Sequence, residues 1–244
     1  AHDIFDIPES AIRVVTPDVG GGFGMKIYLY PEQIVCMWAA RALGRPVRWT
    51  GERTESLVSD THARDQVSRA ELALDKDGRF LGLRVSTLAN LGAYVSMYGA
   101  YIPTQAGHLI MPSVYRWPAF HSEVKCVFTH TVPVDAYRGA GKPETNFIVE
   151  RLIDLAAREM KFSPDELRRR NFITADAFPY KTVTGFSLDS GAFDENMKRA
   201  IAMASGADYG RRQEASRKAG KLRGLGVAAY MRSEEHTSEL QSRL

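Results

Sequence analysis

The sequence predicts an α+β fold, in which strands and helices mix along one chain. Two segments that read as strands, 66–74 and 79–91, flank the turn Asp75-Lys76-Asp77-Gly78 and predict a hairpin. Two longer segments, 28–43 and 143–160, have helical periodicity and a proline in the first turn. The composition, 44% hydrophobic and 25% charged over 244 residues, is that of a globular protein.

Shorter segments complete this prediction. We expect further strands at residues 11–16, 46–50, 120–129 and 222–230. We expect short helices at residues 52–59, after the N-cap Ser163, and near 193–205 and 208–219. Residues 92–118 have no clear period, which indicates a loop with one short helix.

The two long helices are each expected to bury one face. In the first, the expected stripe consists of Ile34, Val35, Trp38, Ala39 and Ala42, and Gly44 ends the helix. In the second, it consists of Phe147, Ile148, Arg151, Leu152 and Leu155. Two charged groups are expected to be solvated or to complement helix dipoles: Glu144 with Glu150, and Arg168 to Arg170.

Net charge, hydropathy and the two cysteines argue against a nucleic-acid partner, a membrane span and a cysteine-held metal site. The 32 basic and 29 acidic residues give a net charge of +3, with no basic stripe, so we expect no nucleic-acid partner. The chain has no run of about 18 apolar residues, so we expect no membrane span. Cys36 and Cys126 are 90 positions apart, which fits a reducing, cytoplasmic compartment and no iron–sulfur or zinc site in this chain.

The last thirteen residues differ in composition from the rest of the chain. Residues 232–244 contain leucine as their one apolar residue type, and RSEEHTSELQS resembles the in-frame translation of a sequencing adapter. The chain also begins without methionine. We therefore expect a partial native domain over 1–231, cut at both ends, and a non-native tail over 232–244; a native polar tail is the alternative.

A cluster of glycines, Gly20-Gly21-Gly22-Phe23-Gly24, lies between an expected strand and an expected helix. Clustered glycines let backbone N–H groups approach a phosphate or another oxyanion. The spacing fits neither the dinucleotide fingerprint nor the P-loop. The remaining alternatives are a tight turn and a stand-alone phosphate- or nucleotide-binding module.

A second such loop is Arg138-Gly139-Ala140-Gly141, which also precedes an expected helix. The planar guanidinium of arginine suits an anionic or carbonyl ligand. Two loops of this kind indicate a cleft that holds an oxyanionic molecule.

Several stretches together resemble a known family. IRVVTPDVGGGFGMK, RALGRPVRWTGERTESL, AYRGAGKPETNFIVERLIDLAARE and SPDELRRRNFI occur in that order. They resemble the molybdenum-binding large subunit of the xanthine dehydrogenase/aldehyde oxidase/carbon monoxide dehydrogenase superfamily. The resemblance covers nearly all of residues 1–231, which is under a third of such a subunit.

The resemblance implies a site made by both loops. Its cofactor-binding residues are Gly21, Gly22, Phe23, Gly24, Ala136, Tyr137, Arg138 and Gly139. Arg138 is the implied active-site residue. No protein side chain is a metal ligand, because the dithiolene of the pterin holds the molybdenum. The family's base glutamate lies outside this stretch.

The resemblance also implies cofactors, partners and a reaction. The cofactor is molybdopterin, in its cytosine dinucleotide form, with FAD on a medium subunit and 2Fe–2S clusters on a small one, in a dimer of heterotrimers. The reaction is hydroxylation of a small molecule, an aldehyde or N-heteroaromatic compound, with water as the oxygen source. Gly139 stands where carbon monoxide-oxidising members have cysteine, and Ile27 where purine-oxidising members have glutamate. The alternative is an inert, non-catalytic fragment.

Overall fold

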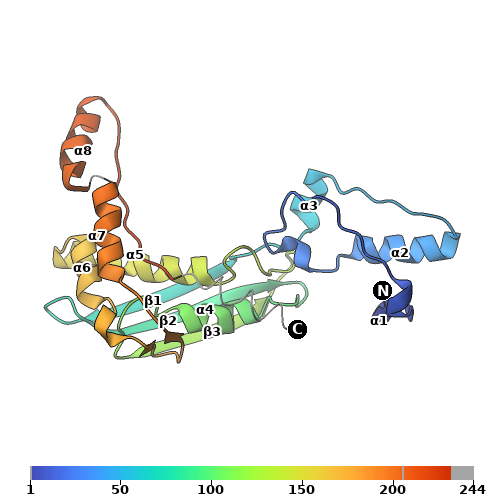
Figure 1. Ribbon diagram of the computed structural model, residues 1–244, viewed down its shortest axis with the longest axis horizontal. Helices are drawn as coiled ribbons and strands as arrows, with labels where there is room; N and C mark the ends of the chain where they lie inside the picture. Colours follow the sequence, from blue (N-terminus) through green and yellow to red (C-terminus); the bar gives the residue numbers. More distant parts are fainter. Residues whose placement is uncertain (1, 205, 232–244) are drawn as a thin grey trace. The chain divides into compact units, whose positions relative to one another are not determined.

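The computed structural model describes residues 2–204 and 206–231, which form two compact units (Figure 1). The first comprises residues 2–65, 89–102 and 126–140, and we call it the loop unit. The second comprises residues 66–88, 103–125, 141–204 and 206–231, and we call it the sheet unit. The expected non-native tail, 232–244, lies outside the described residues.

A three-stranded sheet confirms the predicted α+β class. Its strands are β1 (Gln66–Leu74), β2 (Phe80–Gly92) and β3 (Phe120–Phe128), in the order β1-β2-β3. The turn between β1 and β2 is the predicted one, with the N–H of Gly78 donating to the carbonyl of Asp75 at 3.1 Å. The Asp75 carboxylate also accepts the N–H groups of Asp77 and Arg79 at 2.9 Å, which explains the aspartate at this turn.

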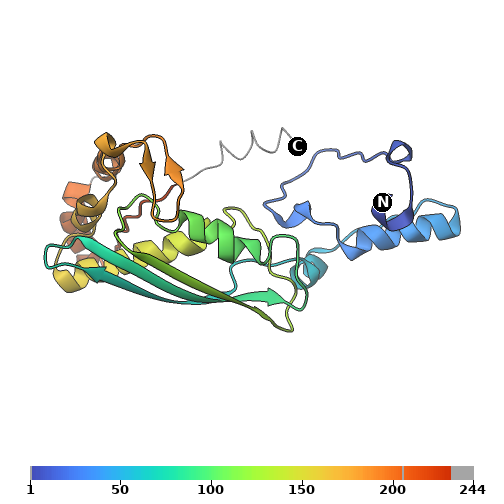
Figure 2. The ribbon, with the colours of Figure 1, turned by 90° about the horizontal axis from the view of Figure 1, so that it is seen from below.

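Helices cover one face of this sheet. The helices α4 (Gly107–Ile110) and α5 (Lys142–Met160) lie over the same face (Figure 2). Burial alternates along β1, as expected for a sheet with one covered side. The expected short helix within 92–118 is present as a π-helical turn, Ile102–Ala106, that continues into α4.

The predicted buried face of α5 is wrong. Phe147 is 69% exposed, and Arg151 is also exposed. The residues that are buried are Thr145, Val149, Glu150, Ile153, Ala156 and Ala157. This face is rotated from the predicted one because small residues, Ala156 and Ala157, allow the helix to lie close to the sheet, while the larger Ile148 and Leu152 pack at the margin of the core.

The core of the sheet unit is rich in aromatic rings. Phe80 stacks on Trp117 with ring centroids 4.4 Å apart, and Tyr115 stacks on Phe172 at 5.4 Å. The helix α6 (Pro164–Asn171) begins at the predicted N-cap, where the Ser163 hydroxyl accepts the N–H of Glu166. The aromatic rings and the apolar side chains of the strands and helices form one hydrophobic core.

A buried ion pair corrects the prediction of solvated charges. The Arg168 side chain is fully buried and contacts the carboxylates of Glu150 at 2.8 Å and Asp154 at 2.9 Å. The Tyr115 hydroxyl donates to the other Glu150 oxygen at 2.6 Å. Burial opposes the charged form of Arg168, but Glu150, Tyr115 and Asp154 together outweigh it and raise the pKa of Arg168. Helical spacing alone did not reveal these partners, because the carboxylates lie on α5 and the arginine lies on α6.

The remaining elements of the sheet unit are short. They are η4 (Ala175–Ala177), β4 (Tyr180–Lys181), β5 (Ser187–Leu188), α7 (Phe193–Met203), η5 (Gly206–Asp208) and α8 (Tyr209–Lys218). The predicted strand at 222–230 is wrong, since this segment pairs with no strand in the described residues. Alternate residues, Val227, Ala229 and Met231, still pack on the core.

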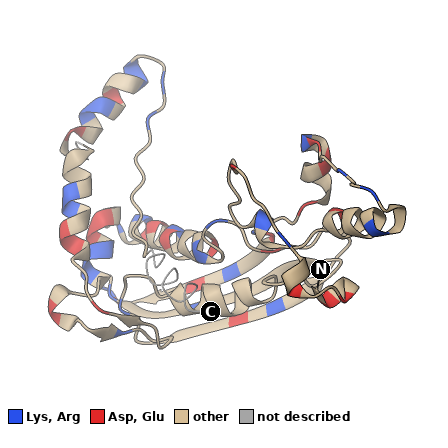
Figure 3. Ribbon diagram, turned by 45° about the vertical axis from the view of Figure 1, so that its right-hand side comes forward, with Lys and Arg blue, Asp and Glu red and all other residues tan. Residues whose placement is uncertain are grey.

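Acidic and basic residues are interspersed along α6, α7 and α8 (Figure 3). Several of them pair one turn apart, as Glu166 with Arg170 and Glu195 with Arg199 do. Within residues 2–204 and 206–231, no helix is long and apolar enough to cross a membrane.

The loop unit consists mostly of irregular backbone with short helices. They are α1 (His2–Phe5), η1 (Glu9–Ala11), η2 (Met25–Ile27), α2 (Pro31–Leu43) and α3 (Arg53–Ser59). The predicted strands at 11–16 and 46–50 are wrong, because neither segment pairs with a strand in the part of the chain described. Val14 is 84% exposed, so its β-branched side chain has no sheet to pack against.

Helix α2 confirms the predicted helix but not its predicted stripe. It starts at Pro31 rather than at residue 28, because Tyr30, before the proline, is held extended. It ends at Gly44, which is left-handed as predicted. Val35 and Trp38 are more than half exposed, because no other element of the loop unit covers that side of α2 in the described residues.

Candidate functional site

The two loops predicted from the sequence contact each other within the loop unit. Residues 21–24 lead into η2, and residues 136–139 follow a β-bridge between His62 and Val134. The backbone N–H of Arg138 donates to the carbonyl of Phe23 at 2.8 Å. The structure therefore places the predicted site residues side by side, although they are more than a hundred positions apart in the sequence.

The contact between the loops is tightest at Gly24. Gly24 has a φ of +108°, and a Cβ atom there would lie 2.4 Å from the carbonyl oxygen of Ala136. It would also lie 2.9 Å from the carbonyl carbon of the same residue. Both atoms belong to the backbone and have little freedom to move, so this approach requires glycine.

Two aromatic rings and a guanidinium lie beside this contact. The rings of Phe23 and Tyr137 are tilted by 32° with centroids 6.4 Å apart. The guanidinium carbon of Arg138 lies 5.9 Å from the Phe23 centroid, a cation–π distance. All three side chains are exposed, and Arg138 forms no ion pair within the described residues. The cation is therefore available to a ligand.

Left-handed backbone is concentrated at the two loops. Phe23 and Ala140 have positive φ values of 51° and 33°, beside Gly21 at 124° and Gly139 at 100°. Such conformations in residues other than glycine cost about 1–3 kcal/mol each and cluster at binding sites and active sites. This observation is independent of the loop contact and supports the same location.

Arg64 belongs to this site but was not predicted. Its guanidinium donates to the carbonyl of Arg138 at 2.5 Å and lies 5.2 Å from the centroid of the Tyr137 ring. It comes from a segment to which the sequence assigned no element and no motif. The site thus gains a second cation, and Arg64 supports the backbone that carries Arg138.

A buried hydrogen-bond network beneath the loops was also missed. The side chain of Asp135 lies out of water and accepts hydrogen bonds from the Tyr28 hydroxyl and from the N–H of Tyr98, the latter at 3.0 Å. Burial, followed by the hydrogen bond to Asp135, raises the pKa of Tyr28. The sequence had placed Tyr28 in a helix, and that assignment hid its role.

The glycine loop also presents unused donors. Within the described residues, the backbone N–H groups of residues 21–24 donate no hydrogen bond. A Cβ atom at the neighbouring Gly20 would meet nothing within 4 Å, so the backbone there is open on one side. Open N–H groups next to an unpaired arginine suit a ligand rich in oxygen atoms.

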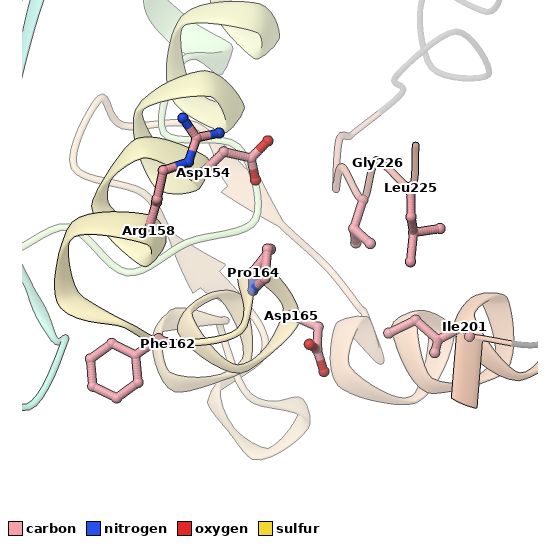
Figure 4. Close-up of a pocket in the computed structure, with 10 residues that line it drawn as sticks. Asp154, Arg158, Phe162, Pro164, Asp165, Ile201, Leu225 and Gly226 are labelled. Atoms are coloured by element: carbon pink, nitrogen blue, oxygen red, sulfur yellow. The ribbon is translucent and has the colours of Figure 1, made fainter. Parts of the chain in front are cut away.

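The sheet unit contains a separate cavity of about 460 Å³ (Figure 4). Its walls come from α5, α6, α7 and residues 225–227. The two acidic side chains that line it, Asp154 and Asp165, are engaged with Arg168 and Arg169. The loops are therefore the better candidate, because their donors are not already satisfied.

Comparison with known proteins identifies the family. Residues 1–172 match the family described as "Molybdopterin cofactor-binding domain", and this range includes both loops. The chain is 36% identical to the 6-hydroxypseudooxynicotine dehydrogenase complex subunit gamma of Paenarthrobacter nicotinovorans, over 93% of this chain and 29% of that protein. It is 36% identical to the carbon monoxide dehydrogenase large chain of Hydrogenophaga pseudoflava, over 92% of this chain and 28% of that protein.

A solved structure of a related enzyme has the same fold as this chain. The crystal structure of quinoline 2-oxidoreductase from Pseudomonas putida 86 superposes with a TM-score of 0.79 and 37% identity, over 84% of this chain and 26% of that one. The chain spans under a third of the length of these relatives. The chain belongs to the molybdopterin cofactor-binding domain family of molybdenum-dependent dehydrogenases and hydroxylases.

Proposed function

We propose that this chain is a segment of the catalytic large subunit of a molybdenum hydroxylase, and that its two loops together hold the molybdopterin cofactor. The observation that carries the proposal is the contact of Gly24 with the backbone of Ala136, beside the hydrogen bond from Arg138 to Phe23. It joins the two segments that carry the family motifs. Residues 21–24 and 136–139 are the proposed binding residues.

The residues present fit such a cofactor. A pterin with a phosphate or a dinucleotide tail offers many oxygen acceptors, and the open N–H groups of residues 21–24 are donors for them. The unpaired guanidinium of Arg138 adds a charge-assisted donor. When bound, the cofactor supplies the redox chemistry that the side chains of this chain do not. The cytosine dinucleotide form is part of the proposal.

The proposed reaction is oxidative hydroxylation of an aldehyde or an N-heteroaromatic compound. One C–H bond is broken and one C–O bond is formed with oxygen from water, and two electrons and two protons leave. The proposed acceptors of the electrons are 2Fe–2S clusters and FAD on a small and a medium partner subunit. The free thiols of Cys36 and Cys126 support a reducing, cytoplasmic setting for this assembly.

The side chains at the loops support this choice of substrate. The exposed faces of Phe23 and Tyr137 can stack on a planar ring, and Arg138 can hold its heteroatom or a carbonyl oxygen. One relative is named for quinoline, which is an N-heteroaromatic compound. We do not propose carbon monoxide as substrate, because Gly139 provides no thiol next to Arg138.

Arg138→Ala in the complete large subunit, assembled with its partners, tests this function. We expect kcat/KM for a panel of aldehydes and N-heteroaromatic compounds to fall more than about tenfold, which is about 1.4 kcal/mol of transition-state stabilisation. The wild-type product should carry the heavy isotope when the reaction is run in oxygen-labelled water. Arg151→Ala, which removes an exposed arginine of α5, is the matched control. Equal turnover by the wild type and Arg138→Ala with every substrate would contradict the proposed role.

A further inference from the structure

We propose that Tyr28 and Asp135 are a positioning pair, which fixes the register of the Arg138 loop against the glycine loop. Neither residue belongs to the family motifs from which the site was predicted. The inference rests on the proposed function only for its consequence in catalysis. The structural claim itself concerns two side chains and two loops of the loop unit.

Tyr28 and Asp135 each lie next to one of the two loops in the chain. Asp135 directly precedes the loop of residues 136–139, and Tyr28 follows Gly24 by four positions. A bond between their side chains therefore links the two loops immediately next to the residues proposed to bind the cofactor. The link is in addition to the backbone contact at Gly24.

The Tyr28 hydroxyl forms two hydrogen bonds to the start of the Arg138 loop. The Tyr28 hydroxyl donates to Oδ1 of Asp135, and the same hydroxyl oxygen accepts the N–H of Ala136 at 2.8 Å. One phenol group thus binds both the side chain before the Arg138 loop and the first N–H of that loop. A phenylalanine in its place would lose both bonds while keeping the ring.

The carboxylate of Asp135 is buried. Asp135 is 2% exposed, and no lysine, arginine or histidine forms an ion pair with it in the described residues. A buried carboxylate without a cation depends on its hydrogen bonds, here from Tyr28 and from the N–H of Tyr98 at 3.0 Å. Its backbone is also fixed, because the N–H of Asp135 donates to the carbonyl of His62 at 2.7 Å. The carboxylate is therefore anchored on several sides.

Asp135 is therefore held in place by its hydrogen bonds, and the Tyr28 side chain joins it to the segment that follows the glycine loop. Arg138 lies three residues beyond Asp135 and already depends on Phe23 for its N–H partner. Without the Tyr28 hydroxyl, the N–H of Ala136 keeps just the carboxylate next to it as a partner in the described residues. We expect the loop then to separate from the glycine loop more often.

The test is Tyr28→Phe in the complete, assembled large subunit, read by hydrogen–deuterium exchange of the peptide covering residues 136–141. We expect exchange in this peptide to become about tenfold faster, because the variant loses the bond to the Asp135 carboxylate and the bond from the N–H of Ala136. We also expect kcat/KM to fall with little change in molybdenum content, since the loops open more often but, without a clash at Gly24, still close on each other. Asp135→Asn is the stronger variant, and Tyr28→Phe keeps the test valid if Asp135→Asn does not fold.

Tyr115→Phe is the matched control. It removes a buried phenol–carboxylate bond of the same kind, from Tyr115 to Glu150 at 2.6 Å, in the sheet unit. It should leave exchange in residues 136–141 unchanged even if it lowers the melting temperature. Unchanged exchange in Tyr28→Phe, or the same change in Tyr115→Phe, would overturn the positioning role. Absence of molybdenum from the wild type would instead overturn the proposed function, and the exchange result would still decide the structural claim.

Discussion

Replacing Arg168 with methionine is expected to lower the free energy of unfolding by about 3–5 kcal/mol. Arg168 is fully buried and contacts Glu150 and Asp154 at 2.8 and 2.9 Å. It also donates to the backbone carbonyl of Pro164 at 2.9 Å. Methionine fills part of the volume but leaves the Glu150 carboxylate buried without its cation, and an unpaired buried charge is among the most destabilising changes in a protein.

Denaturant unfolding of the complete subunit measures this effect. Arg169→Met is the control, because Arg169 forms its ion pairs with Asp165 and Asp194 at a partly exposed position. Such surface pairs contribute about 0–1 kcal/mol. A loss for Arg168→Met within about 1 kcal/mol of that for Arg169→Met would show that the buried pair does not hold α5 to α6.

Gly24→Val is expected to abolish cofactor loading. The new side chain would begin 2.4 Å from the carbonyl oxygen of Ala136, and the residue would have to keep a φ of +108°. The backbone strain alone costs about 1–3 kcal/mol, and the clash can be relieved only by separating the loops. Since about 1.4 kcal/mol is a factor of ten in an equilibrium, the molybdenum content should fall tenfold or more.

Gly20→Ala is the control, because it adds a side chain to the same loop without a clash. A Cβ atom at position 20 meets nothing within 4 Å. We expect the molybdenum content of this variant to equal that of the wild type. Full molybdenum content in Gly24→Val would refute the requirement for close approach at this position.

Local patterns were sufficient to predict most of the sheet unit. The hairpin, the N-cap at Ser163 and the helices α5 and α7 follow from periodicity and turn chemistry that act over a few residues. The glycine loop and the Arg138 loop were also identified from their residues alone. The sequence suggested one cleft for both, and the structure shows the contact between them.

The features that were missed depend on residues far apart in the chain. Tyr28 and Asp135 are separated by 107 positions, and neither shows a local pattern that indicates the other. Glu150 and Arg168 lie on different helices, so helical spacing placed both at the surface. Which face of a helix is buried, and which charges are paired, is decided by tertiary packing rather than by periodicity alone.

The wrong strands have a common cause. Residues 11–16 are rich in β-branched side chains and residues 222–230 in apolar ones, and neither segment forms a strand in the structure. A strand also needs a partner for its backbone groups, and composition does not show whether one is present. In the second segment the alternation nevertheless brings Val227 and Ala229 onto the core.

We would first measure the molybdenum and pterin content of the complete large subunit, purified with its partners from a host that makes the cofactor. If the two loops hold molybdopterin, the wild type should contain about one molybdenum and one pterin per large subunit, and Gly24→Val should contain little of either. A folded, assembled wild-type complex without molybdenum, or a Gly24→Val complex that is fully loaded, would contradict the account.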